Sequence, residues 1–263
     1  MLKRIVLVLL LLVAVRAQAA EFTDVYYDPA EDGWGVFLVQ SDTTQFLAFF
    51  IYGADGKPTW YVAILAQDAT GKFSGDLLAT TGTYFPNPWQ GKTNALAGNA
   101  TFTPIDAYHA TLSYTVNGVG TVTKVVQRQT LTGYILAGNY SGAGSGTINN
   151  CPNPGQNEPM YRSRFDAVVT QVGDQSATLV FTFVDPAHAG LVCTLTGSLT
   201  HFGRLYQLNG QSSCTVNGMP VGAVQAVTID NFHPTGHGIE GHITAIDGCT
   251  ASVHFASVLN TNN

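Results

Sequence analysis

The feature that most constrains the fold is a series of short strand-like segments at regular spacing across residues 136–259. About eight such segments follow one another, at residues 137–148, 162–172, 175–185, 191–201, 205–214, 221–231, 238–246 and 249–258. Turn signals such as Gly173-Asp174, Gly203-Arg204 and Asn217-Gly218 separate most of them. Antiparallel strands with short loops leave two exposed sheet edges, and closure into a barrel removes those edges. We therefore expect an eight-stranded up-and-down barrel in residues 133–263.

Four cysteines, all in this half of the chain, predict two disulfides. If Gly203-Arg204 forms a two-residue turn, Cys193 and Cys214 face each other as a non-hydrogen-bonded pair, in which side chains lie close together. In an alternating meander Cys151 and Cys249 lie at the same end of the barrel as that pair, on strands that become neighbours on closure. The predicted disulfides are therefore Cys193–Cys214 and Cys151–Cys249.

The first of the eight segments carries glycines at alternate positions, Gly142, Gly144 and Gly146, together with Gly138. A strand without side chains on one face can bend sharply to close a small barrel. The same face could instead form a smooth floor beneath a ligand, so both interpretations stand at this point.

Residues 21–132 form a predicted N-terminal β-domain of short strands. Segments 45–52 and 59–65 are apolar at both even- and odd-numbered positions, which predicts central strands covered on both faces. The cover on the far face is expected to be a second sheet, the other domain or a partner. Segment 107–116 alternates apolar with polar residues, as a half-buried strand does, and Asn117-Gly118 predicts a hairpin after it. The expected fold class is all-β, with two antiparallel parts of which the second is the barrel.

The first 20 residues have the pattern of a secretory signal peptide. Lys3 and Arg4 precede an apolar run at residues 5–15, and residues 17–19 fit a small-x-small cleavage site. That run is too short to cross a bilayer as a helix, and no later run reaches the required length of roughly 18 residues. We expect an exported protein without a transmembrane helix, located in the periplasm, outside the cell or at the cell surface.

The charge balance limits the expected partners. Only 11% of the residues are charged, against about 25% in an average soluble domain. Without Lys3, Arg4 and Arg16 of the predicted signal peptide, 8 basic side chains remain against 17 acidic ones. An acidic surface repels phosphate backbones, so nucleic acid is not an expected partner.

The stretch richest in side chains that could bind a ligand or catalyse a reaction lies near the start of the first half. Three aromatic and three acidic side chains crowd together there: Tyr26, Tyr27, Asp28, Glu31, Asp32 and Trp34. The simplest interpretation is structural, with the acids closing a turn and the tryptophan entering the core. Aromatic rings also stack on the C–H faces of sugars while carboxylates accept hydroxyl hydrogen bonds, which suggests a binding site for a carbohydrate. A lipid or an envelope protein is another possible ligand.

Catalytic chemistry has weaker support in the sequence. Glu31 acting with Asp28 or Asp32 could hydrolyse a glycoside if two carboxylates faced the substrate. The cluster His233, His237, Glu240 and His242 resembles a metal site. Alternation along a strand, however, places His237 on the opposite face from Glu240 and His242, so we expect no metal and no cofactor. The sequence contains neither a nucleophile elbow nor a phosphate-binding glycine loop.

Most of the chain after residue 20 resembles a family of exported, uncharacterised proteobacterial β-rich proteins. The family pattern joins an aromatic pair and Asn-Pro to Glu-x-Gly-Trp-Gly, and later has Tyr-Gly-x-x-Gly-x-Pro-x-Trp-Tyr. This chain matches it at residues 26–29, 31–35 and 52–61, with Asp28 in place of the asparagine. In the second half, residues 138–142 and the four cysteines match the companion region. The resemblance implies export and a β-rich architecture and assigns no activity.

Together these patterns predict an exported, non-catalytic module that binds a ligand or partner. Two alternatives stay open: a glycan hydrolase that uses Glu31 with Asp28 or Asp32, and a purely structural surface protein.

Overall fold

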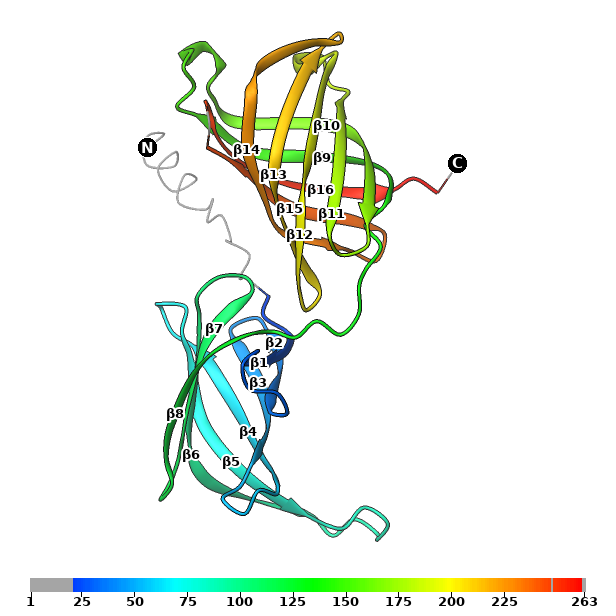
Figure 1. Ribbon diagram of the computed structural model, residues 1–263. Helices are drawn as coiled ribbons and strands as arrows, with labels where there is room; N and C mark the ends of the chain where they lie inside the picture. The colour runs from blue at the N-terminus through cyan, green and yellow to red at the C-terminus, as the bar shows by residue number, and fades with distance from the viewer. Residues whose placement is uncertain (1–20, 247, 262–263) are drawn as a thin grey trace, which may run out of the picture.

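The computed structural model describes residues 21–246 and 248–261, and nearly all of its regular structure is antiparallel strand. The chain forms two closed eight-stranded barrels, one after the other (Figure 1). In each barrel every strand pairs with the next in sequence, and the last pairs with the first. The predicted signal peptide lies outside the described residues.

The first barrel closes through a very short first strand. Tyr26 and Tyr27 of that strand pair with Arg128 and Gln127 of the last one. The eight strands are β1 (Asp24–Tyr27), β2 (Gly35–Ser41), β3 (Thr44–Tyr52), β4 (Pro58–Gln67), β5 (Phe73–Gly82), β6 (Lys92–Pro104), β7 (His109–Val116) and β8 (Gly120–Arg128). Inward-facing aromatic and aliphatic side chains fill the interior, among them Leu47, Phe49 and Phe102.

The outer face of this barrel narrows one sequence expectation. Segments 45–52 and 59–65 were expected to be covered on both faces, but only their inward residues, such as Leu47 and Leu65, are buried. On the outward face Phe46 is 45% exposed, Trp60 59% and Ile64 62%. Closure of the sheet on itself covers the inner face only, and no second layer of the described chain packs on β3 and β4. Of the three covers expected for the far face, neither a second sheet nor the other domain packs there in the described chain, and a partner stays a prediction.

The second barrel confirms the meander that the sequence predicts. Its strands are β9 (Gly138–Asn149), β10 (Glu158–Val172), β11 (Ser176–Phe183), β12 (Leu191–Phe202), β13 (Leu205–Val216), β14 (Met219–Pro234), β15 (Gly238–Ala245) and β16 (Thr250–Leu259). Two short 3-10 turns, η1 (Pro154–Gln156) and η2 (Pro186–His188), lie in its connections. The first and last strands, β9 and β16, pair from Tyr140↔Leu259 to Asn149↔Thr250 and close the barrel.

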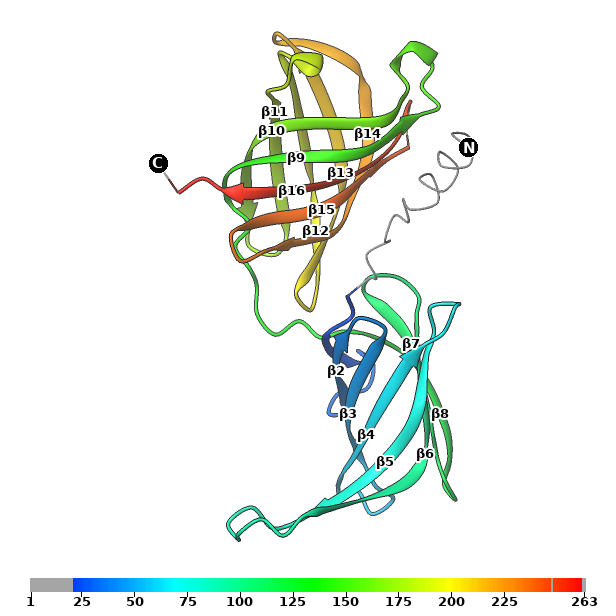
Figure 2. The same ribbon diagram turned by 180° about the vertical axis from the view of Figure 1, so that it is seen from behind.

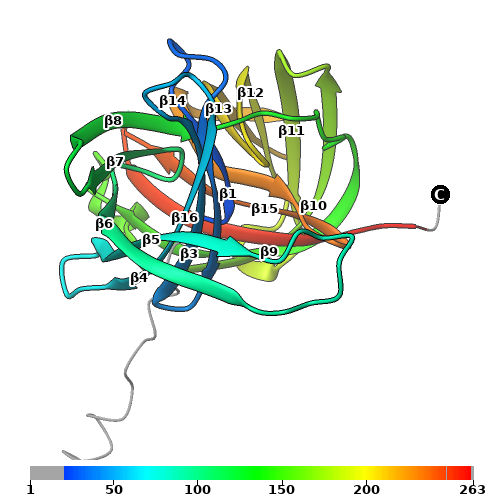
Figure 3. The same ribbon diagram turned by 90° about the horizontal axis from the view of Figure 1, so that it is seen from below.

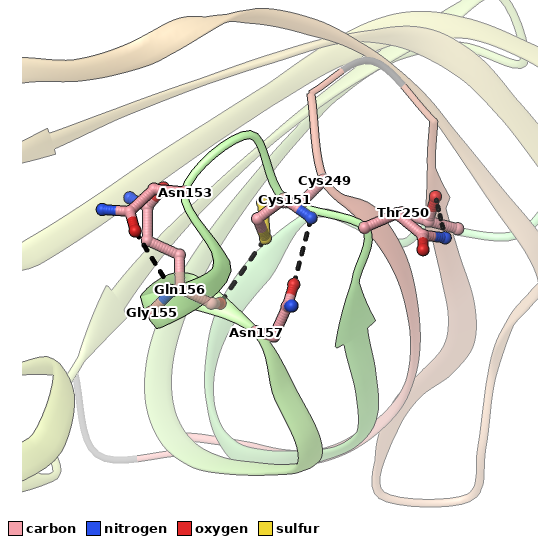
Figure 4. Close-up of a disulfide and its surroundings, with 8 residues drawn as sticks. Cys151, Asn153, Gly155, Gln156, Asn157, Cys249 and Thr250 are labelled. Atoms are coloured by element: carbon pink, nitrogen blue, oxygen red, sulfur yellow. Dashed lines mark hydrogen bonds between the residues drawn. A yellow bond between two sulfur atoms is a disulfide. The ribbon is translucent and has the colours of Figure 1, made fainter.

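The disulfide prediction is confirmed, together with the register on which it rests. Phe202 pairs with Leu205 across the turn, and the same register places Cys193 opposite Cys214, which are bonded to each other. Cys151 is bonded to Cys249 at the closing seam between β9 and β16 (Figure 4). Both disulfides lie at one end of the second barrel.

The glycines of β9 allow its backbone to approach β16 closely. A Cβ atom at Gly142 would lie 2.4 Å from the carbonyl oxygen of Ala256, and one at Gly146 would lie 2.0 Å from that of Ser252. Both distances are far inside van der Waals contact. The structure therefore supports the interpretation that these glycines permit closure at the seam.

A hairpin of the second barrel joins the two barrels. The β12–β13 turn reaches down to the first barrel (Figures 1 and 2), where the ring of Phe202 lies 4.7 Å from that of Tyr108. The Tyr108 hydroxyl accepts a hydrogen bond of 3.0 Å from the Asn231 N–H, and Arg204 N–H donates to Asp24 at 3.3 Å. Polar and aromatic contacts thus fix this hairpin on the first barrel.

Arg128 anchors the first-barrel side of this joint. Its guanidinium is buried and lies 3.1 Å from the Asp24 carboxylate. It also donates to three carbonyl oxygens, those of Ala107, Glu21 and Thr23. A buried charge is tolerated when paired and hydrogen-bonded in this way. Here the guanidinium ties residues 21–24 to β8.

Candidate functional site: a cavity in the second barrel

The second barrel encloses an apolar cavity of about 270 Å³ at its disulfide end. The walls come from inward positions on several strands, since side chains alternate between the two faces of a strand. The aromatic and aliphatic part of the lining includes Phe165, Phe181, Leu195, Val227, Ile243 and Phe255. The size is close to the lower limit of roughly 300 Å³ for small-molecule pockets.

The cavity exists because the two ends of the barrel are filled differently. At the end near the first barrel, large side chains are fully buried in the core: Leu136, Tyr206, Phe232 and Ile239. At the disulfide end the inward positions carry small residues, including Gly144, Ala245 and Ala251. The barrel is therefore a cup, closed towards the joint and hollow below the two disulfides.

Both disulfides stiffen the end at which the cup opens. Cys193 and Cys214 belong to the cavity wall itself. Cys151 and Cys249 hold the turn after β9 beside the start of β16, and the Cys151 N–H donates to the Asn157 side chain at 3.0 Å (Figure 4). The mouth is thus held by covalent bonds and not by packing alone.

A histidine between two carboxylates lies at the mouth. In η2, Nδ1 of His188 is 2.9 Å from Oδ1 of Asp185, and Nε2 is 3.3 Å from Oε1 of Glu158 at the start of β10. Burial opposes a charge on His188, but the hydrogen bonds to the two carboxylates outweigh it and raise the pKa of the imidazole. The hydroxyl of Ser163 donates to Asp185 and lowers the pKa of that carboxyl. These four side chains form what we call the mouth clasp.

The mouth clasp is suited to holding a loop and not to proton transfer. Both ring nitrogens of His188 face carboxylate oxygens, so neither is directed at a molecule in the cavity. The ring of Tyr161 lies 5.4 Å from that of His188, and burial raises the pKa of its hydroxyl to about 12, so it stays neutral. Polar atoms that could orient a ligand belong to Ser212 and Gln225 in the lining.

The structure places Tyr26 apart from the other residues of the predicted first-half site. Its ring is buried in the first core, 5.2 Å from Phe102, and burial raises the pKa of its hydroxyl, which has no hydrogen-bond partner within the described chain. Tyr27, whose side chain points to the opposite face of the strand, is half-buried. Tyr26 is therefore a core residue and cannot contact a ligand at the surface.

The remaining residues of that site form a turn. Asp28 accepts from the Ala30 N–H at 3.0 Å, and Trp34 Nε1 donates to Glu31 at 3.1 Å while its ring packs partly against the core. Glu31 is ion-paired with Lys124, whose hydrogen bond lowers the pKa of the Glu31 carboxyl. Asp32 is exposed. A general acid needs a raised pKa, so this geometry gives no support to glycoside hydrolysis through Glu31.

The histidine-rich segment near residue 240 is distributed over the outer surface. His233 lies 3.0 Å from Glu240, and His242 stacks on His254 of the neighbouring strand with 4.1 Å between ring centroids. His237 is exposed in the turn before β15. Within residues 21–246 and 248–261, no group of three or more histidine, cysteine, aspartate or glutamate side chains could hold a metal ion.

Sequence reasoning did not identify the mouth clasp. Glu158, Ser163, Asp185 and His188 come from β10 and from the connection between β11 and β12. The local signals are the Gly173-Asp174 turn between the two strands and the turn-favouring Asp185-Pro186 pair, and neither indicates a contact with Glu158 or Ser163. The clasp depends on the long antiparallel pairing of β10 with β11, which brings the start of β10 beside the end of β11 and the loop that follows it.

No protein-family model, curated protein or solved structure matches this chain. Two disulfides are consistent with an oxidising, exported location. In the part of the chain that the structure describes, no helix is long and apolar enough to cross a membrane.

Proposed function

We propose that this protein is an exported binding protein that holds a small apolar molecule in the cup of the second barrel. The observation that carries the proposal is the cavity of about 270 Å³ beneath the two disulfides. A small barrel whose interior is not filled by side chains is a common ligand site, because it removes the ligand from water on all sides.

The lining indicates which chemistry suits the cup. Phenyl rings and branched aliphatic chains dominate the wall, so hydrocarbon or aromatic surface would be buried with a gain of about 25 cal/mol per Å². At the mouth two carboxylates surround one histidine, so the net charge there is negative whether or not the imidazole is protonated. A neutral molecule with one hydroxyl or carbonyl group fits better than an anion such as a fatty acid.

Location in the periplasm or outside the cell belongs to the same proposal. The signal-peptide pattern of residues 1–20 and the two disulfides support it. An exported protein that carries apolar cargo keeps a poorly soluble molecule out of water between membranes or at the cell surface.

A matched pair of substitutions tests the proposal. Ala251 and Ala256 both lie on β16, but Ala251 lines the cavity and Ala256 faces outward. Binding of the neutral dye N-phenyl-1-naphthylamine would be followed by fluorescence, with decanol and decanoic acid as competitors. We expect Ala251→Leu to abolish dye binding and Ala256→Leu to leave it unchanged, with decanol the stronger competitor.

Two results would contradict the proposal. The first is a wild-type protein that binds neither the dye nor decanol. The second is equal dye binding by wild type and Ala251→Leu, which would place the dye on the exposed apolar outer face of the first barrel.

A further inference from the structure

The β5–β6 hairpin projects beyond the wall of the first barrel (Figures 1 and 3). Pairing between β4 and β5 reaches only to Val62↔Leu78, whereas β5 and β6 continue to pair as far as Gly82↔Lys92. Residues 80–82 and 92–96 are accordingly exposed on both faces. The end of this hairpin therefore contributes nothing to the barrel core.

Three aromatic side chains stand at the tip of this hairpin. Tyr84 is 68% exposed, Phe85 89% and Trp89 70%. Exposing such large apolar groups costs free energy in water, and elsewhere in the chain similar rings fill the core. Because these rings are exposed together at a projecting tip, we expect a partner that removes them from water.

Contacts within the tip hold its loop in one shape. The Asn87 N–H donates to the carbonyl of Tyr84 at 2.9 Å, and the Gln90 N–H donates to the hydroxyl of Thr83 at 2.9 Å. The rings of Tyr84 and Phe85 are in edge contact, 5.4 Å apart, and Pro86 and Pro88 restrict the backbone between the aromatic residues. Such contacts reduce the conformational entropy that the backbone of the tip would lose on binding.

The charge around the tip differs from that of the rest of the chain. From residue 77 to residue 105 the sequence contains no aspartate or glutamate, although the whole protein carries 17 of them. Lys92, at the base of the tip, is the one charged residue in that interval. A segment free of acidic groups can enter the headgroup region of a bilayer without burying a negative charge.

We propose that this tip anchors the protein to a lipid bilayer by shallow insertion of Tyr84, Phe85 and Trp89. Tyrosine and tryptophan are enriched at membrane–water interfaces, where their apolar bodies meet the acyl boundary and their polar atoms stay hydrated. The inference is independent of the proposed ligand cavity, which lies in the other barrel.

A bilayer suits the tip better than a protein partner does. A stable protein interface buries roughly 800 Å² on each side, and three aromatic side chains of roughly 150–250 Å² each fall short of that area. The tip is also the end of a narrow, projecting two-stranded hairpin (Figures 1 and 3). Such a shape inserts between lipid headgroups, whereas a protein partner would need a matching cavity.

Flotation with vesicles of phosphatidylcholine, with and without phosphatidylglycerol, tests the anchor. We expect the wild-type protein to float with phosphatidylcholine vesicles, and Phe85→Ser and Trp89→Ser to bind about tenfold more weakly each. Ile105→Ser is the matched control, because Ile105 is an exposed apolar residue in the β6–β7 turn at the opposite end of the barrel. It should bind as the wild type does.

A spectroscopic readout locates the inserted group. In the double variant Trp34→Phe/Trp60→Phe, Trp89 is the remaining tryptophan. Its emission should shift to the blue on vesicle addition and be quenched by lipids brominated near the headgroup.

Several outcomes would overturn the anchor. These are no flotation of the wild type, equal flotation of Phe85→Ser and wild type, or loss of flotation in Ile105→Ser. Flotation that requires phosphatidylglycerol and vanishes in high salt would indicate adsorption through lysines and would also contradict insertion. Dye binding by the same variants keeps this test separate from that of the cavity, since substitutions at the tip should leave dye affinity unchanged.

Discussion

Removal of the two disulfides one at a time should destabilise the second barrel by different amounts. The double variants are Cys151→Ala/Cys249→Ala and Cys193→Ala/Cys214→Ala. The first bond links residues 98 apart in sequence and the second links residues 21 apart. A cross-link restricts the unfolded chain more strongly when it closes a longer loop, so the loss of the 151–249 bond should cost more.

The loop lengths give the size of the difference. The chain-entropy relation predicts losses of about 4.7 kcal/mol for the 151–249 bond and about 3.3 kcal/mol for the 193–214 bond at 25 °C. All four cysteines are at least partly buried at the same end of the barrel. Truncation to alanine therefore removes similar packing from both variants, and the difference of about 1.4 kcal/mol isolates the loop contribution.

Urea unfolding followed by far-ultraviolet circular dichroism measures the two free energies. The three tryptophans, Trp34, Trp60 and Trp89, all belong to the first barrel or its loops. An unchanged native tryptophan spectrum therefore shows that each variant leaves the first barrel folded. Both variants should also have larger m-values than the wild type, because the unfolded chain becomes less compact. Equal losses, or a larger loss for the 193–214 pair, would refute the loop-entropy reasoning.

Three further measurements test the joint and the mouth clasp. Tyr108→Phe removes the hydroxyl that bonds across the joint, and should lower the free energy of unfolding by about 1–3 kcal/mol in urea titrations; no measurable loss would mean that the joint contributes nothing. In Arg128→Met the Asp24 carboxylate, which has little exposure, loses its ionic partner. This should lower the free energy of unfolding by about 3–5 kcal/mol, and Asp24→Asn in the same background should recover part of that loss in thermal melts. Burial opposes the charge on His188, but the neighbouring carboxylates, Asp185 included, raise its pKa above the unfolded value of about 6.5. The stability that His188 gives the folded protein is therefore complete below that pH and disappears as pH rises through the folded pKa. His188→Gln should therefore cost more stability in acid than in alkali, and a pH-independent cost would contradict the ion pairing.

The parts of the fold that follow from local patterns were predictable. Alternation along each strand and the turn at Gly203-Arg204 were sufficient to derive the register of β12 and β13, and with it the pairing of Cys193 with Cys214. Strand direction, together with the expected closure of the barrel, then placed Cys151 and Cys249 together. Such inferences succeed because period-two alternation and tight turns are properties of neighbouring residues.

The parts that depend on distant residues were not predictable. Whether the outward rings of Phe46 and Trp60 are covered depends on what packs outside the sheet, and alternation along a strand carries no information about that. The cavity depends on small residues meeting at one end of the barrel, from strands as far apart in sequence as β9 and β16. Crowding of acids and aromatics around Glu31 suggested chemistry, but Lys124, which pairs with it, lies on β8, far along the chain.

The joint between the barrels determines how the cup and the aromatic hairpin tip are oriented relative to each other. Because the β12–β13 turn rests on the first barrel, the open end of the cup faces away from it, and the aromatic hairpin tip lies at the other extremity of the protein (Figure 1). A bilayer held by that tip is separated from the mouth of the cup by the length of both barrels. Cargo would therefore be exchanged with the surrounding water, or with a second surface opposite the mouth, and not with the lipid to which the protein is attached.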